Sequence, residues 1–390
     1  MKVYLKGVNS CVMRRQKLEQ YREYFDQNGH TLVDSENDAE KVLVWTCSFR
    51  ADVRDNSLAE IKRLRDNGAD VVVGGCLPDI DNKILAEHHD GDVLNWKDDV
   101  EKMADIFGSE KVKLSDLVVT YGEDQVCEDL EVYKKEHPNE DVQFYDRFNK
   151  LVISEGCPLR CTYCSEKLMF PPFYSFPVND VVAKCKAMVE NTGEYRVSLL
   201  ADSLGDYGSD LESDFPSLLH SLRGIDDRIS FLLGNLNPYH IIKFYDEFDD
   251  MLGKGYFHHI SLPMQSGSDK VLELMERPYT AADLTRIYEL LDRHGFDNYD
   301  THILIGFPGE QEEDFLLTCE LILDRKPNHV LLSGCMLNEN IPAAKLAGRV
   351  DDAVIASRIS RAEKLFSEVG IFCNAEGGIH MTSRMKERMN

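Results

Sequence analysis

The chain has 390 residues, of which 43% are hydrophobic and 29% are charged; this excludes a disordered protein and allows two or three folded domains. Its formal net charge of −25 repels phosphate backbones, which makes a nucleic-acid partner less favoured unless a local basic patch exists. No apolar run approaches the ~20 residues of a membrane span and no signal-peptide pattern opens the chain, so we expect a cytoplasmic protein without a membrane partner.

Residues 1–100 alternate predicted strands with predicted helices. Apolar residues recur at helical spacing before Gly29 and again before Gly68, each glycine marking a helix end. Strands that alternate with helices predict a parallel sheet with right-handed crossovers. The predicted strands of this first domain lie at 3–5, 41–45 and 70–73.

Three cysteines, here called the N-terminal cysteines, follow these strands. Cys11, Cys47 and Cys76 each lie just past the carboxyl end of one strand, the edge at which open α/β sheets bind ligands. Taken singly, each would be interpreted as a small buried hydrophobic residue. Because 11 cysteines in a chain without a secretion signal favour metal or redox sites over disulfides, we expect the three thiols to gather there.

Residues 101–148 are acidic and are interpreted as a linker. From residue 149 to about residue 345 strands and helices alternate again, and a helical extension is expected over 346–390. Six βα units are fewer than the eight that close a barrel, so the expected fold class is α/β, with an N-terminal parallel-sheet βαβ domain followed by a partial (β/α)6 barrel. Its predicted strands are Leu151–Ser154, Arg196–Leu200, Ile229–Leu233, His258–Leu262, Thr301–Ile305 and His329–Ser333.

A second group, the loop cysteines, directly follows the first barrel strand. Cys157, Cys161 and Cys164 stand in a C-x3-C-x2-C pattern, with Tyr163 before the third. Three thiolates can hold three irons of a cubane cluster and leave the fourth iron open for a ligand. The alternative is a structural zinc loop, which needs a fourth ligand and usually has shorter spacings.

These motifs together resemble the radical S-adenosylmethionine (SAM) superfamily and, within it, the methylthiotransferases. Besides the cysteine loop, the resemblance rests on NSC, WTCSFRADVRDNS and GGCLP around the N-terminal cysteines. It also rests on the later segments LADSLGDYGSD, LPMQSGSDKVLELMERPYT and ILIGFPGEQEEDF, and so covers residues 1 to about 345.

The resemblance implies two 4Fe–4S clusters and SAM as cofactors. The loop cysteines would hold the cluster that cleaves SAM, and the N-terminal cysteines would hold an auxiliary cluster carrying the sulfur to be donated. One SAM methylates that sulfur, and a second yields the radical that takes a hydrogen from an unactivated C–H bond of the substrate. A flavodoxin-type or ferredoxin-type electron donor is the implied partner.

Contacts to SAM are expected from rim loops of the barrel, and we assign no side chain an acid–base role. A plain turn or a solvated acidic loop is the alternative for most of these positions, and the role of Cys335, after the sixth strand, is left open. The expected SAM contacts are Tyr163, Asp202, Ser203, Gln265 and Phe307.

Two departures from the family pattern bear on the surroundings of the auxiliary cluster and on the substrate. Arg14 and Trp45 occupy places where family members usually have Asn, and no segment after about residue 345 resembles the RNA-binding TRAM domain, which we expect to be missing. Together with the net charge, the expected absence of the TRAM domain favours a methylthiotransferase acting on a peptide or protein side chain, for example a precursor peptide. The alternatives are a tRNA adenosine methylthiotransferase, another radical SAM sulfur-insertion enzyme, and a non-catalytic iron–sulfur electron carrier.

Overall fold

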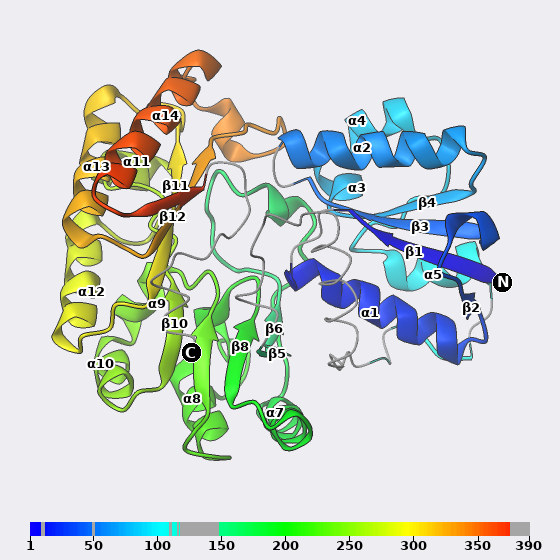
Figure 1. The fold of residues 1–390 in the computed structure, drawn as a ribbon, viewed down its shortest axis with the longest axis horizontal. Helices are drawn as coiled ribbons and strands as arrows, with labels where there is room; N and C mark the ends of the chain where they lie inside the picture. The colour runs from blue at the N-terminus through cyan, green and yellow to red at the C-terminus, as the bar shows by residue number, and fades with distance from the viewer. Residues whose placement is uncertain (9–11, 49–50, 109–110, 115–116, 118–147, 375–390) are drawn as a thin grey trace. The chain divides into compact units, whose positions relative to one another are not determined.

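The computed structural model of the protein describes residues 1–8, 12–48, 51–108, 111–114, 117 and 148–374 (Figure 1). These residues form two compact units. The first, here called the N-terminal unit, spans Met1–Tyr121 and also includes Cys164–Pro171 and Asn338–Ile341. The remainder of the described chain forms the second unit, the barrel unit. The predicted domain limits at residues 100 and 148 stay a prediction.

The N-terminal unit is built on a parallel four-stranded sheet. All three predicted strands are confirmed, and a two-residue strand that was not predicted adds to one edge. The strand β3 is buried along nearly its whole length, as expected for a parallel sheet covered on both faces. In sheet order the strands are β2 (Thr31–Leu32), β1 (Lys2–Gly7), β3 (Lys41–Thr46) and β4 (Val71–Gly75).

Helices cover both faces of this sheet. Figure 1 shows α1 (Val12–Gln27) and α5 (Asp99–Phe107) on one face, and α2 (Ala51–Asp66) and α4 (Asn82–His88) on the other. Two separate apolar cores result, one against each face. The short helix α3 (Leu77–Ile80) begins directly after β4.

The barrel unit contains a parallel sheet of seven strands in chain order. The six predicted strands are confirmed, and β13 adds a seventh beside β12, which was not predicted. The two edge strands, β5 and β13, do not pair with each other within the described residues, so the sheet is open and the predicted α/β class is confirmed. The strands are β5 (Asn149–Val152), β8 (Arg196–Leu200), β9 (Ser230–Leu233), β10 (Phe257–Ser261), β11 (Tyr299–Ile305), β12 (His329–Gly334) and β13 (Phe372–Asn374).

Eight helices among the described residues accompany this sheet, and Figure 1 shows α10, α12 and α13 along its outer side. Local signals set their ends: Thr280 and Asp283 form a capping box at the start of α12, and Gly193 ends α7 in the left-handed conformation. The helices are α7 (Val178–Thr192), α8 (Phe215–Arg223), α9 (Pro238–Lys243), α10 (Tyr245–Gly253), α11 (Asp269–Leu274), α12 (Ala281–Arg293), α13 (Glu312–Arg325) and α14 (Asp352–Glu368).

The short elements complete the description. Strands β6 (Ser154–Glu155) and β7 (Tyr174–Ser175) pair antiparallel around the cysteine loop. Single 3-10 turns lie at η1 (Glu36–Asp38), η3 (Ser165–Leu168), η4 (Leu204–Asp206) and η5 (Pro342–Lys345). Among the helices described here, none combines the length and apolar character that crossing a membrane requires.

Candidate functional site

Two of the N-terminal cysteines lie at the same level of adjacent strands. Thr46 pairs with Gly75 in the parallel ladder of β3 and β4, so Cys47 and Cys76 are the next residue on each strand. The Cys76 N–H donates to the Thr46 carbonyl oxygen over 3.0 Å, and both thiols are buried. Neighbouring strands lie about 4.8 Å apart, so these two cysteines are close neighbours at the carboxyl edge. Cys11 lies outside the described residues.

The backbone at this edge requires a glycine. Gly75 has a φ of +93°, and a Cβ atom there would lie 2.2 Å from the Thr46 carbonyl oxygen. No other residue type fits that conformation and spacing without displacing β3. The glycine therefore allows the chain to turn and place Cys76 beside Cys47.

A buried polar network that the sequence did not indicate surrounds this edge. Ser48 donates a hydrogen bond to the Asp81 carboxylate, and the Asn338 amide donates to the other Asp81 oxygen over 3.0 Å and to the Ile80 carbonyl over 2.7 Å. Asn338 lies 257 residues from Asp81 in sequence. Only the folded N-terminal unit therefore brings these groups together.

Trp45, one of the two departures from the family pattern, is a core residue. Its ring is 1% exposed and packs against Tyr21 and Trp96, with ring centroids 5.4 and 5.7 Å away. Its effect on the N-terminal cysteines is therefore indirect, through packing beneath the strand end. The side chain of Arg14 lies outside the described residues.

The loop cysteines follow β5 and β6, and Gly156 starts their loop. Cys161 is buried and Cys157 is partly exposed. Burial raises the pKa of Cys157 to about 11, although the Leu159 N–H and the Ser203 side chain act in the opposite direction. In the described part of the chain, no three Cys, His, Asp or Glu side chains form a ready-made metal site. Ligation by these cysteines thus stays a prediction.

The donor chemistry around the loop cysteines nevertheless fits an iron–sulfur cluster. A cluster needs thiolates, and thiolates are stabilised by hydrogen-bond donors directed at sulfur. Cys157 has the Leu159 N–H as such a donor. Cys161 accepts a hydrogen bond from the Arg277 guanidinium over 3.3 Å.

The middle of the cysteine loop is held by the segment after α11. The Thr162 N–H donates to the Met275 carbonyl oxygen over 3.1 Å, and the Thr162 hydroxyl donates to the Leu274 carbonyl over 2.9 Å. Ala343 donates its N–H to the Thr162 carbonyl over 3.0 Å. All of the polar backbone groups of Thr162 are therefore satisfied by other parts of the barrel unit.

Arg277 and Tyr163 lie beside Cys161. One guanidinium nitrogen contacts both the Cys161 sulfur and the Tyr163 hydroxyl, the latter over 3.2 Å. Burial alone would lower the pKa of Arg277, but the two tyrosine hydroxyls beside it and the Cys161 sulfur outweigh burial and raise it. The sequence predicts Tyr163 at this site but not Arg277, which lies in the MERPYT motif.

The loop after β8 also holds the cysteine loop. The Asp202 carboxylate accepts the Gly156 N–H over 2.8 Å, and the buried Ser203 hydroxyl donates to Asp206 over 2.7 Å. Asp206 lies 3.2 Å from the ring nitrogen Nε2 of His240, which is wholly buried. Burial alone would raise the pKa of Asp206, but His240 and Ser203 lower it below its usual value.

Gln265 and Phe307 are placed differently from each other. Gln265 has a φ of +65°, and its backbone hydrogen-bonds with His302 and Leu304 in β11 over 2.9 Å each. The ring of Phe307 is completely buried, so in this structure it packs in the interior of the unit. SAM contact by either residue stays a prediction.

Cysteines expected in the core are confirmed there. Cys185 on α7 and Cys319 on α13 are 0% and 2% exposed and belong to the apolar core of the barrel unit. Cys335 follows β12, and burial raises its pKa to about 12.

Comparison with known proteins assigns the class. The family described as "Radical SAM superfamily" matches residues 151–322, and "Uncharacterized protein family UPF0004" matches residues 2–95. The solved structure of the radical S-adenosylmethionine methyltransferase TsrM from Kitasatospora setae, with cobalamin and a [4Fe-4S] cluster bound, superposes with a TM-score of 0.61. It is 14% identical and the match covers 88% of this chain and 76% of that chain, which shows a shared fold. The open parallel sheet and the cysteine loop are those of a radical SAM enzyme.

Curated relatives define the family within that class. The ribosomal protein uS12 methylthiotransferase RimO of Desulfotalea psychrophila is 30% identical over 86% of this chain and 75% of its own length. The probable threonylcarbamoyladenosine tRNA methylthiotransferase of Pyrococcus horikoshii is 29% identical over 85% of this chain and 76% of its own length. Several further relatives also carry names of tRNA methylthiotransferases. The chain belongs to the radical SAM methylthiotransferase family, is a transferase, and has SAM and 4Fe–4S clusters as its cofactors.

Proposed function

We propose that the protein is a radical SAM methylthiotransferase that inserts a methylthio group into an adenosine of tRNA. The observation that carries the proposal is the pair of family matches, to 2–95 and 151–322, together with curated relatives most of which are named for tRNA. The net charge and the expected absence of a TRAM-like segment favour a peptide or protein side chain instead. The comparisons support its tRNA alternative better.

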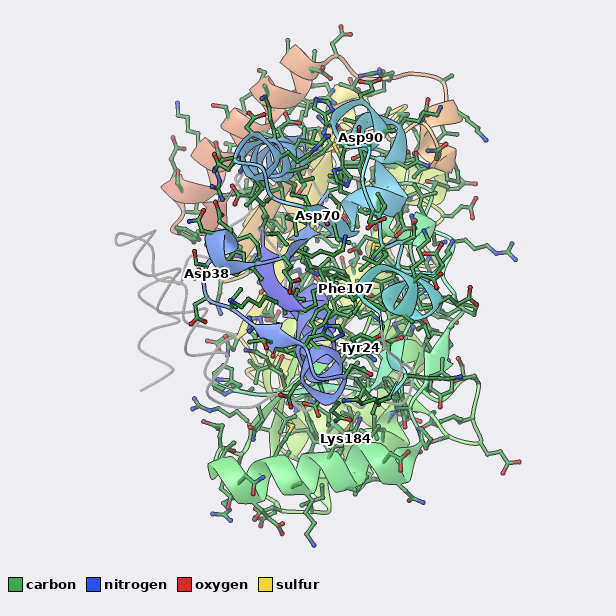
Figure 2. All side chains as sticks on the ribbon, turned by 90° about the vertical axis from the view of Figure 1, so that its right-hand side faces the viewer. Tyr24, Asp38, Asp70, Asp90, Phe107 and Lys184 are labelled. Carbon is green, nitrogen blue, oxygen red and sulfur yellow. The ribbon has the colours of Figure 1, made fainter. Side chains whose placement is uncertain are left out.

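Some exposed acidic residues of the N-terminal unit lie away from its cysteines, so their part of the net charge bears less on a substrate bound there. Figure 2 labels Asp38, Asp70 and Asp90 at the end of this unit where the strands begin. The side chains of Asp70 and Asp90 are 57% and 86% exposed. Cys76 lies at the other end of β4, and five residues span roughly 16 Å. That exceeds the ~10 Å over which 0.1 M salt screens exposed charges.

A ribosomal-protein side chain is the second candidate substrate. The relative at 30% identity is named for ribosomal protein uS12, and a surface with 69 acidic against 44 basic side chains suits a basic ribosomal protein. Both substrates belong to the translation machinery, so either proposal puts the reaction in the cytoplasm.

The N-terminal cysteines and the loop cysteines have separate roles in this proposal. Cys47 and Cys76, with Cys11, would hold the auxiliary cluster, and the loop cysteines would hold the cluster that binds SAM. When bound, these groups supply the sulfur, the methyl group and a carbon-centred radical. Cys47, Cys76 and Cys161 are buried, and this burial would restrict water near a radical.

Residues of the rim loops would bind and orient SAM. We propose that Tyr163, Gln265 and the backbone around Phe307 line the SAM site. Asp202 and Ser203 would act mainly by holding the cysteine loop. Asp202 already accepts a hydrogen bond from the Gly156 N–H, and Ser203 already donates one to Asp206. An external flavodoxin-type or ferredoxin-type protein would supply electrons.

The test is a product assay with both substrates. The anaerobically reconstituted protein is incubated with SAM, a reductant, and either tRNA or uS12 from cells lacking the corresponding methylthiotransferases, followed by mass spectrometry of nucleosides or peptides. Methylthioadenosine in the tRNA is expected. Cys76→Ala should abolish the product, whereas Cys319→Ala, a matched change in the core, should not.

Other outcomes decide between the candidates. Methylthio transfer to uS12 and not to tRNA would establish the second candidate. SAM cleavage to 5′-deoxyadenosine without transfer to either substrate would reject both and point to another sulfur-insertion reaction. A protein that holds iron but never cleaves SAM would be an electron carrier.

A further inference from the structure

The segment Leu274–Tyr279 contacts the cysteine loop at three consecutive residues, Cys161, Thr162 and Tyr163. From these contacts we propose that Arg277 is a positioning residue that sets the reduction potential of the cluster held by the loop cysteines. The proposal rests on the proposed function to the extent that these cysteines hold that cluster. It does not depend on which substrate is modified.

The guanidinium of Arg277 has four polar contacts in fixed directions. Nη1 faces the Cys161 sulfur at 3.3 Å and the Tyr163 hydroxyl at 3.2 Å. Nη2 donates to the Pro263 carbonyl over 3.0 Å, and Nε donates to the Tyr279 hydroxyl over 2.8 Å. A planar fork with five N–H donors can satisfy all of these directions, whereas a lysine ammonium on a flexible stem cannot.

Tyr279 fixes the position of Arg277 in turn. Its hydroxyl donates to the Met264 carbonyl over 2.9 Å and also lies 3.3 Å from the Pro263 carbonyl. Tyr279 is 5% exposed, and its ring lies 5.0 Å from the guanidinium carbon. The loop after β10, which contains Pro263 and Met264, therefore holds the guanidinium beside the sulfur.

The charge of Arg277 lacks a carboxylate partner. The residue as a whole is partly exposed, but its guanidinium group is deeply enclosed. Among the described residues no Asp or Glu pairs with it; its neighbours are one sulfur, two phenol oxygens and one carbonyl. An enclosed charge without a counter-charge is costly. A thiolate of Cys161, bonded to a cluster, would provide the missing negative charge.

A positive donor at a ligand sulfur favours the reduced cluster. A reduced cluster carries one more negative charge than the oxidised one, so a nearby guanidinium stabilises it more. Hydrogen bonds to ligand sulfurs and exclusion of solvent are known determinants of cluster potentials. In the reduction itself one electron passes from the external donor to the cluster, and no bond to Arg277 forms or breaks.

The experiment measures this potential directly. In the full-length chain with the N-terminal cysteines replaced by alanine, only the loop cluster should contribute to the electron paramagnetic resonance signal. Potentiometric titration of that signal is compared for the parent, Arg277→Met, Arg277→Lys and Arg196→Gln. Arg196→Gln is a matched control, because this substitution also removes one guanidinium charge. Arg196 lies at the start of β8, the end of the strand away from the cysteine loop.

Arg277→Met should keep its iron and shift the reduction equilibrium about tenfold toward the oxidised cluster, which is 59 mV for a one-electron couple. Arg277→Lys should show a smaller shift in the same direction, and Arg196→Gln none. Unchanged potentials in both Arg277 variants would overturn the proposal. If Arg277→Met loses its iron, the potential of Arg277→Lys tests the proposal instead. Loss of iron from both variants would show that Arg277 only holds the loop in place, and would overturn the proposal. A parent protein that binds no cluster would instead reject the proposed function.

Discussion

Replacing Gly205 with alanine tests whether the loop after β8 holds the cysteine loop through close packing. A Cβ atom at Gly205 would lie 2.2 Å from Cγ of His240, 2.4 Å from its Cβ and 2.6 Å from its Nδ1. Carbon atoms in ordinary contact are about 3.5 Å apart, so the ring must move by more than ~1 Å. His240 is wholly buried, so moving its ring displaces the side chains packed around it.

Gly205→Ala is expected to lower the free energy of unfolding for two reasons. Overpacking of a buried site costs about 1–3 kcal/mol. Displacing His240 also removes the ring nitrogen that lies 3.2 Å from the buried Asp206 carboxylate, at a further ~1–3 kcal/mol. A total of roughly 3 kcal/mol corresponds to a fall in Tm of about 6–12 °C for a unit of this size. Because Asp206 also contacts Ser203, iron loading of the loop cysteines should fall with it.

Thermal unfolding of the apo-protein, followed by circular dichroism, checks this prediction. Gly234→Ala is the matched control, since a Cβ there meets nothing within 4 Å and should change the stability by less than ~0.5 kcal/mol. The double variant Gly205→Ala/His240→Ala should be no less stable than His240→Ala alone, because the clashing ring is gone. If Gly205→Ala were as stable as Gly234→Ala, the packing argument would be wrong.

Three further predictions concern iron, the loop anchor and pH. The reconstituted wild type should hold about eight irons, and replacing either the N-terminal or the loop cysteines with alanine should leave about four. The variant without the N-terminal cysteines should still cleave SAM. A full iron content in that variant would refute the auxiliary site. Thr162→Val removes a donor to the Leu274 carbonyl and should lower the free energy of unfolding by about 1–3 kcal/mol. Urea denaturation checks this against Thr31→Val, at an exposed position of the edge strand β2. Burial lowers the pKa of His258 to about 4, so the unfolded state gains the proton first and stability is lost as pH falls from about 6.5 toward 4. After a discount for partial exposure this is about 2 kcal/mol, and His258→Gln should show a smaller loss than wild type in urea titrations at pH 7.5 and 4.5.

For the predicted SAM contacts, the sequence indicated positions along the chain but not hydrogen-bond partners. The rim position of Asp202 and Ser203 followed from the strand before them, and both do lie beside the cysteine loop. Their hydrogen bonds to Gly156 and Asp206 could not be predicted, because a hydrogen bond depends on the orientation of a partner far away in sequence. Phe307 is a similar case: its motif marked a turn, and only packing shows that the ring is fully buried.

The sequence by itself determined the α/β class, nine strands of the two sheets and the placement of Cys47 and Cys76 past two strand ends. These features depend on apolar runs, helical spacing and glycines, which are local properties of the chain. Strand β13 and the short β2 were missed because two or three residues have no pattern of their own and become strands only by pairing. Tertiary structure alone decided that Arg277 meets Cys161, 116 residues away in sequence, because the register of whole strands and the packing of α11 bring distant polar groups into contact.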